Sequence, residues 1–168
     1  MSKSSPDRPD KSKIVIRELI ESDLESCVQL FFDTIHSVNA KDYTDKQLDA
    51  WAPATTKATD PRWQTILDHI ACVAEISRTF VGFGDMTKEG YLDRLFVHHD
   101  YQGMGIASAI VKELEGQVRK REIKEISTHA SITAKPFFES LGYVVCKQQE
   151  VYVDGIKLIN FIMKKALK

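Results

Sequence analysis

The stretch Gln102-Gly103-Met104-Gly105-Ile106-Ala107 joins a predicted strand to a predicted helix. Strand-like residues precede it, from Tyr91 to Val97, and a helical pattern follows it, from Met104 to about Arg121. A strand that enters a glycine-rich loop and continues as a helix gathers unpaired N–H groups and the positive end of the helix dipole at one point. The stretch therefore predicts an anion site, where the glycines let a phosphate oxygen approach the backbone closely.

Spacing excludes two other nucleotide-binding loops. No Lys-Ser or Lys-Thr pair follows the glycines, as a P-loop requires. A dinucleotide-binding loop needs a third glycine together with an acidic residue about 20 positions further on, in a strand-helix-strand unit, and this chain lacks that combination. A glycine pair before a helix is also typical of an ordinary turn and cap, so the loop alone leaves that alternative open.

Upstream of the loop, apolar spacing and turn residues predict strands at both ends of a helical region. Ser22 and Glu25 have the spacing of a capping box, which would start the first helix. Pro61 suits the first turn of the third helix. The predicted elements are a strand at 14–17, helices at 22–39, 44–51 and 61–69, and strands at 71–76 and 79–86.

Downstream of its helix, the loop is followed by further strands. We expect a strand at 125–128, a helix at 133–141 that Gly142 ends, and strands at 143–153 and 158–163. The fold class is therefore α+β, with a mixed, mainly antiparallel sheet of six to seven strands and helices on both faces. Residues 1–13 are expected to be a disordered tail, and residues 14–168 a single domain.

Composition excludes several kinds of protein. No apolar run approaches the roughly 18 residues that a membrane span needs, and the N-terminus lacks the apolar block of a secretory signal. A net charge of -1 gives no reason to expect nucleic acid. Three cysteines, far apart and without metal-ligand spacing, suit a reducing cytoplasm. No metal site is predicted, because the adjacent His98 and His99 are expected to diverge on their loop.

Two segments of the chain, in register, resemble the GNAT N-acetyltransferases. Gln102-x-x-Gly105-x-Ala107, after the strand Leu95-Phe96-Val97, is similar to that family's acyl-CoA signature. Ser131-x-x-Ala134-x-x-x-Phe138-x-x-x-Gly142-Tyr143 has the spacing of the family's later helix and strand. The likeness covers roughly residues 14–165, and segments 49–52, 130–139 and 147–149 look most like bacterial YafP-like acetyltransferases.

The resemblance implies that acetyl-CoA enters a wedge between two splayed central strands, the one ending at Val97 and the one at 125–128. Leu95 and Val97 would pair with the pantetheine amides, and residues 102–108 would carry the pyrophosphate. A main-chain N–H near Phe96 or Val97 would face the thioester carbonyl. The implied cofactor residues are Leu95, Phe96, Val97, Gln102, Gly103, Met104, Gly105, Ile106, Ala107, Ser108, Ser131, Ala134 and Phe138.

Acetyl transfer needs a neutral amine, so a base or a chain of waters must remove the ammonium proton. Asp93, two residues before Leu95, is the first candidate, although a carboxylate there could equally pair with a cation; Asp85 is a second candidate. Many GNAT enzymes have a tyrosine at the position of Phe138, and it returns a proton to the CoA thiolate. Phenylalanine cannot do so, which leaves water, Ser131, Tyr152 or departure of the unprotonated thiolate.

The acceptor pocket is expected between residues 31 and 63, the segment least general to the family. Tyr43 and Trp51 are its candidate substrate-binding residues, each with a polar tip, and His36 could reach it too. The predicted acceptor is a primary amine of a small molecule. Acetylation of a protein or peptide amine and a non-catalytic acyl-CoA sensor remain alternatives, and an exposed last strand at 158–163 could form a homodimer.

Overall fold

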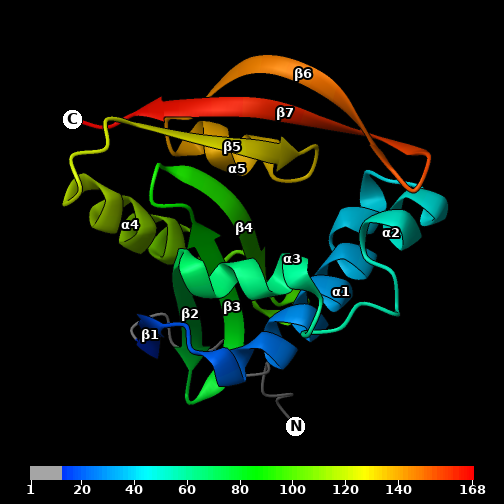
Figure 1. The fold of residues 1–168 in the computed structure, drawn as a ribbon, viewed down its shortest axis with the longest axis horizontal. Helices are drawn as coiled ribbons and strands as arrows, with labels where there is room; N and C mark the ends of the chain where they lie inside the picture. The colour runs from blue at the N-terminus through cyan, green and yellow to red at the C-terminus, as the bar shows by residue number, and fades with distance from the viewer. Residues whose placement is uncertain (1–12) are drawn as a thin grey trace, which may run out of the picture.

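The structure is a computed structural model that describes residues 13–168. A seven-stranded sheet runs through it in the order β1-β2-β3-β4-β5-β7-β6, and only the β4–β5 pair is parallel (Figure 1). The predicted class, a mixed and mainly antiparallel sheet within an α+β fold, is confirmed. Apart from Lys13, the predicted tail lies outside the described residues.

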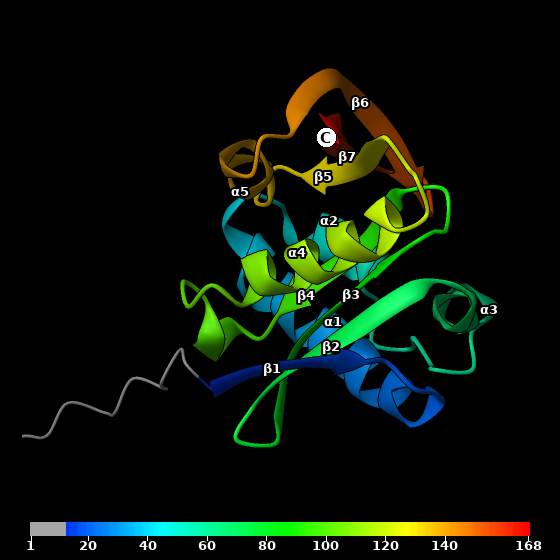
Figure 2. The ribbon, with the colours of Figure 1, turned by 90° about the vertical axis from the view of Figure 1, so that its left-hand side faces the viewer.

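Helices cover both faces of the sheet, and Figure 2 shows α3 and α5 on opposite sides of it. The strands are β1 (Ile14–Glu18), β2 (Ile70–Ile76), β3 (Thr79–Met86), β4 (Tyr91–Val97), β5 (Glu125–Ser131), β6 (Val144–Val153) and β7 (Ile156–Ala166). The α-helices are α1 (Leu24–Ser37), α2 (Asp45–Trp51), α3 (Pro61–Gln64), α4 (Ile106–Arg119) and α5 (Lys135–Ser140). None of the helices in this part of the chain is long and apolar enough to cross a membrane.

The predicted start of the first helix is wrong. Ser22 lies in a short 3-10 turn, Glu21–Asp23, and α1 begins only at Leu24. The Asp23 carboxylate accepts the Ile20 N–H at 2.9 Å and both terminal nitrogens of Arg17 at 2.8 Å. A bidentate guanidinium pair is stronger than a serine cap, so Asp23 determines where the chain turns into the helix.

The last strand is not an exposed edge, contrary to the prediction. β7 lies between β5 and β6 and pairs with both, so its backbone groups are taken up on each side. Double pairing also extends both strands beyond their predicted ends, β5 to Ser131 and β7 from Ile156 to Ala166. The edge strands of the sheet are β1 and β6, and a dimer that joined two sheets would have to use one of them.

The two central strands part after a short contact. β4 and β5 pair only at Tyr91–Ser127 and Leu92–Thr128. Across the other side of β4, Asp85 faces Arg94 whereas Met86 faces Leu92, which leaves Asp93 as an extra, bulged residue. A bulge bends its strand and increases the local twist, and it stands at the point where β4 leaves β5. The predicted splayed pair is thereby confirmed.

Helix α4 packs closely against the strand β3. A Cβ on Gly84 would lie 2.8 Å from Ile110 and 3.1 Å from the Arg94 carbonyl oxygen, so only glycine fits there without a shift. Ile110 and Leu114 of the helix are fully buried against the sheet. This close approach fixes the position of α4, and hence of the glycine loop at its N-terminus.

A buried carboxylate ties α4 to the far half of the sheet. Glu115, only 5% exposed, accepts the Tyr143 hydroxyl at 3.0 Å and the Lys165 ammonium at 3.0 and 3.1 Å. Burial, followed by the Glu115 charge, raises the pKa of Tyr143, so its hydroxyl stays protonated and acts as a donor. The network connects α4 with the start of β6 and the end of β7, across the gap between the two halves.

Glu115→Ala should lower the free energy of unfolding by about 2 kcal/mol, because it leaves the Tyr143 hydroxyl and the Lys165 ammonium without their acceptor. That is less than the loss of a fully buried pair, since the Lys165 side chain is 23% exposed. Glu113→Ala is the matched control on the exposed side of the same helix, with an expected change within about 0.5 kcal/mol. Urea unfolding measures both, and equal effects would contradict the network's role.

Candidate functional site

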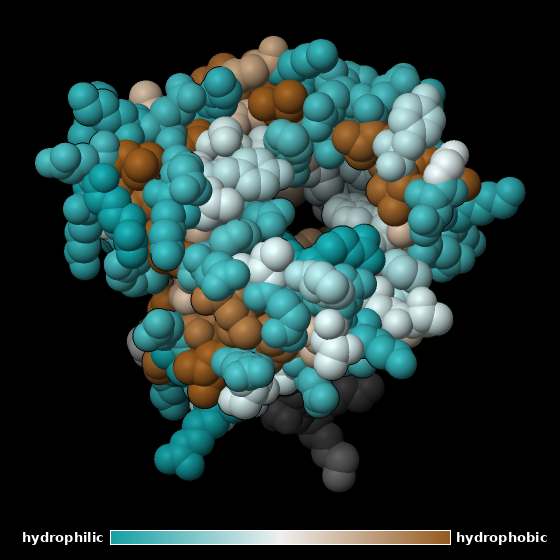
Figure 3. Space-filling view, in the orientation of Figure 1, coloured by the Kyte–Doolittle hydropathy of each residue, from teal (hydrophilic) through white to brown (hydrophobic). Residues whose placement is uncertain are grey.

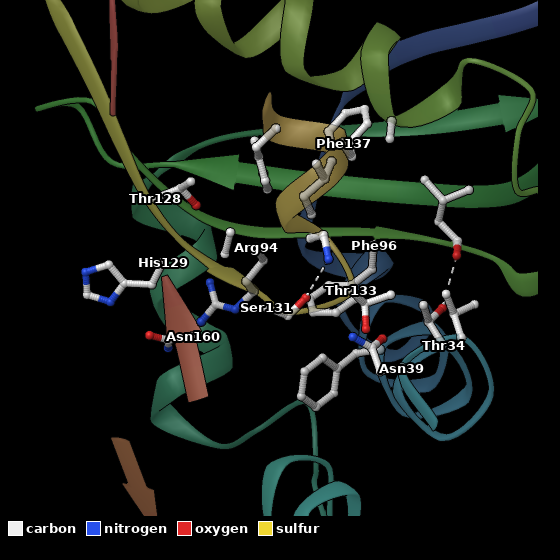
Figure 4. Close-up of a pocket in the computed structure, with 18 of the residues that line it drawn as sticks. Thr34, Asn39, Arg94, Phe96, Thr128, His129, Ser131, Thr133, Phe137 and Asn160 are labelled. Atoms are coloured by element: carbon white, nitrogen blue, oxygen red, sulfur yellow. Dashed lines mark hydrogen bonds between the residues drawn. The ribbon is translucent and has the colours of Figure 1, made fainter. Parts of the chain in front are cut away.

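A cavity of about 700 Å³ lies where β4 and β5 part. Its walls come from α1, β4, the loop at 101–108, β5, α5 and β7. Figure 3 shows a hollow near the centre of the face drawn, and Figure 4 shows the side chains around the cavity. The bulged bend in β4 therefore makes room for a ligand of substantial size within the sheet itself.

The structure brings almost all of the predicted site residues to this cavity. Met104 is the exception, since its side chain packs against the hydrophobic core instead. The predicted residues that line the cavity are Tyr43, Trp51, Asp93, Leu95, Phe96, Val97, Gln102, Gly103, Gly105, Ile106, Ala107, Ser108, Ser131, Ala134 and Phe138. Residues from four separate segments of the chain thus meet at one place.

The main chain of β4 faces the cavity at Leu95 and Val97. The His98 N–H donates to the Val81 carbonyl at 2.8 Å, and hydrogen-bonded pairs alternate along an antiparallel ladder. Leu95 and Val97 therefore turn their own N–H and C=O groups away from β3, toward the gap that β5 has left. The Val97 carbonyl already accepts hydrogen bonds from Thr34 and Gln102 at 3.2 and 2.7 Å, which leaves its N–H for a ligand.

The glycine loop forms an open cradle at the start of α4. Gly103 and Gly105 have φ values of 73° and 82°, and no other described atom lies within 4 Å of where a Cβ would be on either. The first intrahelical hydrogen bond runs from the Ala109 N–H to the Gly105 carbonyl, so the N–H groups of residues 106–108 lack helix partners. Open space, free N–H groups and a helix dipole together fit a pyrophosphate.

The part of the wall opposite β4 that α5 supplies is apolar. Phe138 is 3% exposed, and its ring packs edge-on against Tyr143 with centroids 5.1 Å apart. Ser131 accepts the Ala134 N–H at 3.0 Å, which leaves its own hydroxyl proton free to donate. Tyr152 is 67% exposed and does not line the cavity, so it is not the proton source that the sequence suggested.

Asp93 stands at the bulge with its side chain 34% exposed. Burial raises the pKa of its carboxyl and the Asp85 charge adds to this, while the Arg94 guanidinium at 3.4 Å acts in the opposite direction. The pKa of Asp93 is thus above its ordinary range. A carboxylate with a raised pKa is a stronger base and accepts a proton more readily.

Asp85 has a different position from Asp93. It is fully buried, does not line the cavity, and holds His69 at 2.6 Å and Arg94 at 2.7 Å. The hydrogen bond to Asp85 raises the pKa of His69. Asp85 therefore orients Arg94, and through it the carboxylate of Asp93, rather than meeting a ligand itself.

Two clusters could offer ligands to a metal ion. His98, His99 and Asp100 bring one ligand atom each within 4.8 Å of one another, and the histidine rings stack at 4.3 Å rather than diverging as expected. His69, Asp85 and Asp93 form the other cluster. There the Arg94 guanidinium already lies against both carboxylates, so a metal ion would meet a fixed positive charge.

The aromatic candidates of the acceptor segment differ in their contacts. Tyr43 is 8% exposed, and its hydroxyl accepts the Ile132 N–H at 2.9 Å and donates to the Ile159 carbonyl at 2.8 Å. The Tyr43 hydroxyl is thus already hydrogen-bonded to the main chain as donor and as acceptor, and only the ring is available to a substrate. Trp51 packs edge-on against Tyr43, whereas His36 bonds the Ala52 carbonyl and does not line the cavity.

Sequence reasoning missed several polar residues of the lining, above all on β5, β7 and just after α1. They include Thr34, Asn39, Arg94, Thr128, His129, Thr133 and Asn160. A usable signal existed for one of them, since Asn160 is a lone amide within the apolar run of a strand. For the others, only the three-dimensional arrangement places the side chain at the cavity.

Comparison with known proteins agrees with this site. An acetyltransferase (GNAT) domain model matches residues 39–166. The uncharacterised N-acetyltransferase YafP of Escherichia coli K12 is 33% identical over 154 residues, which cover 91% of this chain and 96% of YafP.

Solved structures show the same fold. A GCN5-related N-acetyltransferase from Rhodopseudomonas palustris is 28% identical with a TM-score of 0.85, over 91% of this chain and 95% of that one. The PaiA N-acetyltransferase of Thermoplasma acidophilum, solved with coenzyme A, has a TM-score of 0.71 at 20% identity, over 92% and 99% of the two chains. With its cleft, glycine cradle and family match, this chain belongs to the GNAT family and is an acetyl-CoA-dependent acetyltransferase.

Proposed function

We propose that the enzyme transfers the acetyl group of acetyl-CoA to a primary amine of a small molecule, by direct attack within a ternary complex. The observation that carries this proposal is that the segment between α1 and α2 lines the cavity and is hydrogen-bonded to its far wall. A protein or peptide acceptor needs an open groove at this place, and the segment runs across it.

Three sets of hydrogen bonds hold the acceptor end closed. Tyr43 bridges the main chains of Ile132 and Ile159, at the ends of β5 and β7. Thr133 donates to Asp42 at 2.7 Å. The Gln47 side chain donates to the carbonyl oxygen of Lys157 at 2.8 Å. The segment is therefore fastened to both strands of the far wall, which limits the acceptor to what the cavity itself admits.

Bound acetyl-CoA supplies the activated acetyl group. For the cofactor grip, Leu95 and the Val97 N–H offer main-chain partners to the pantetheine, and residues 102–108 offer N–H groups to the pyrophosphate. Ala134 and Phe138 form the apolar wall, which excludes water from the reacting atoms. Most of this binding is made by backbone groups, so it depends on the course of the chain more than on side-chain identity.

Asp93 is the residue we assign as the base. Its carboxylate lines the cavity beside the bulge, attracts an ammonium group, and has a raised pKa that favours proton transfer. Phe138 supplies no proton to the departing thiol. That proton comes from water or from the free Ser131 hydroxyl, or the thiolate departs without one. The three cysteines of the described chain are unbonded, which suits a reaction in the cytoplasm.

Gly105→Glu should abolish CoA binding, because a carboxylate would occupy the phosphate cradle and repel the pyrophosphate. The left-handed backbone at this residue would cost about 1 kcal/mol of stability with any side chain, which is too little to unfold the protein. Gly116→Glu is the control, since it adds the same group further along α4, where no atom crowds the site. Calorimetric titration with CoA measures both, and unchanged affinity in a folded Gly105→Glu protein would refute the cradle.

Asp93→Asn should lower kcat/KM by about 100-fold, as expected for the loss of a general base. In the wild type, kcat/KM should fall as pH decreases through the raised pKa of Asp93, because only the carboxylate accepts a proton. In the variant, this decrease of kcat/KM at low pH should disappear. Asp49→Asn removes an exposed carboxylate outside the cavity and should leave the profile unchanged. If the decrease of kcat/KM at low pH persists in Asp93→Asn, another residue is the base.

A panel of small primary amines should be acetylated faster than peptides with a free N-terminus or a lysine, because the fastened segment blocks an extended chain. Thiol release from acetyl-CoA measures the turnover of each acceptor. Faster turnover of peptides would favour the protein-acetylating alternative. Tight CoA binding without turnover of any acceptor would favour the sensor.

A further inference from the structure

The two asparagines of the chain, Asn39 and Asn160, both line the cavity. Asn39 follows α1 and is 5% exposed, whereas Asn160 lies on β7. Figure 4 shows both amides among the lining side chains, with no hydrogen bond drawn from either. The Asn160 Oδ1 is buried and has no partner among the described residues. Buried polar atoms are nearly always hydrogen-bonded, so the unpaired Asn160 oxygen in this cavity indicates a ligand that donates to it.

Both amides belong to the acceptor end of the cavity. Tyr43, four residues after Asn39, bonds the carbonyl of Ile159, the residue before Asn160. Asp42 bonds Thr133 on the loop that follows β5. These contacts bring the segment of Asn39 against the strand of Asn160, away from the glycine cradle at the N-terminus of α4. The amides therefore lie away from the pyrophosphate cradle, where the proposed acceptor would bind.

Neither arginine of the described lining is free to pair with a substrate carboxylate. The Arg94 guanidinium bonds Asp85 at 2.7 Å and Thr65 at 3.3 Å, lies near Asp93 and is covered by the Trp63 ring at 5.0 Å. The other arginine of the lining, Arg62, has a side chain that is 74% exposed and pairs with Asp60. Asp93 adds negative charge beside them. An acceptor with a carboxylate would find a carboxylate and two neutralised arginines.

We infer that Asn39 and Asn160 select an amine that also carries a neutral hydrogen-bonding group, such as a carboxamide or a hydroxyl, over an alkylamine or an amino acid with a free carboxylate. This inference rests on the proposed small-molecule acceptor and specifies its class. The Asn160 oxygen requires an N–H or O–H donor, and the Asn39 amide can either donate or accept. A site whose buried polar groups would be left unpaired discriminates strongly against an analogue that lacks the matching group.

Three amines of the same heavy-atom shape test it: β-alaninamide, β-alanine and 3-methylbutylamine, together with the same trio one methylene longer. For at least one length, kcat/KM for the amide should exceed that for the acid and the alkylamine by about tenfold or more. Asn39→Leu and Asn160→Leu, which keep the side-chain shape, should each lower kcat/KM for the amide by about tenfold and that for the alkylamine by less than about twofold. Gln29→Leu removes an exposed amide of α1 outside the cavity and should change neither.

The two proposals fail in different ways. If all the amines turn over at the same rate, and if selectivity is unchanged in folded Asn39→Leu and Asn160→Leu proteins, the role of the amides is overturned. The small-molecule acceptor is not affected by this result. Faster turnover of the acids would also overturn the role of the amides. No turnover of any small amine by a protein that still binds acetyl-CoA would overturn the small-molecule acceptor, and this inference with it. Thermal unfolding of each variant shows whether a lost rate comes from a lost fold.

Discussion

The parting of β4 from β5 after two residue pairs is the constraint on which the rest of this structure depends. Backbone N–H and C=O groups inside a protein must find partners, yet the main-chain groups of Leu95 and the N–H of Val97 face a gap without a strand. An extended ligand with amides of its own is the natural partner of such an edge. The bulge at Asp93 bends β4 at the point where the gap begins. The same extra residue therefore also places a carboxylate there.

A gap between two strands weakens a sheet because it removes hydrogen bonds between them. Other contacts at both ends of this gap hold the two halves of the sheet together. Glu115 ties α4 to the residues Tyr143 and Lys165 of the far half. Tyr43 fastens the segment after α1 to β5 and β7. These contacts cross the gap without filling it. In the proposed function, one end of the cavity would admit the cofactor and the end beside Tyr43 would hold the acceptor.

The sequence predicted the features that depend on local patterns and missed those that depend on distant partners. The glycine loop and the helix after it carry local signals, and both lie where predicted. The prediction of a helix cap at Ser22 was wrong because Asp23, bound by Arg17, lies at the start of the helix instead. The position of β7 failed because a strand's place in the sheet depends on which strands it pairs with, and no local pattern records that.

The same division applies to the site. The proposed cofactor residues could be named in advance because most of them would act through backbone groups on a recognisable loop and strand. The acceptor residues could not, since they come from α1, β5 and β7 and meet only through contacts such as the one between Tyr43 and Ile159. In this arrangement the half of the cavity that binds acetyl-CoA follows from the course of the main chain. The proposed acceptor half depends on side chains, so we expect single substitutions at Asn39 or Asn160 to change selectivity and to leave CoA binding intact.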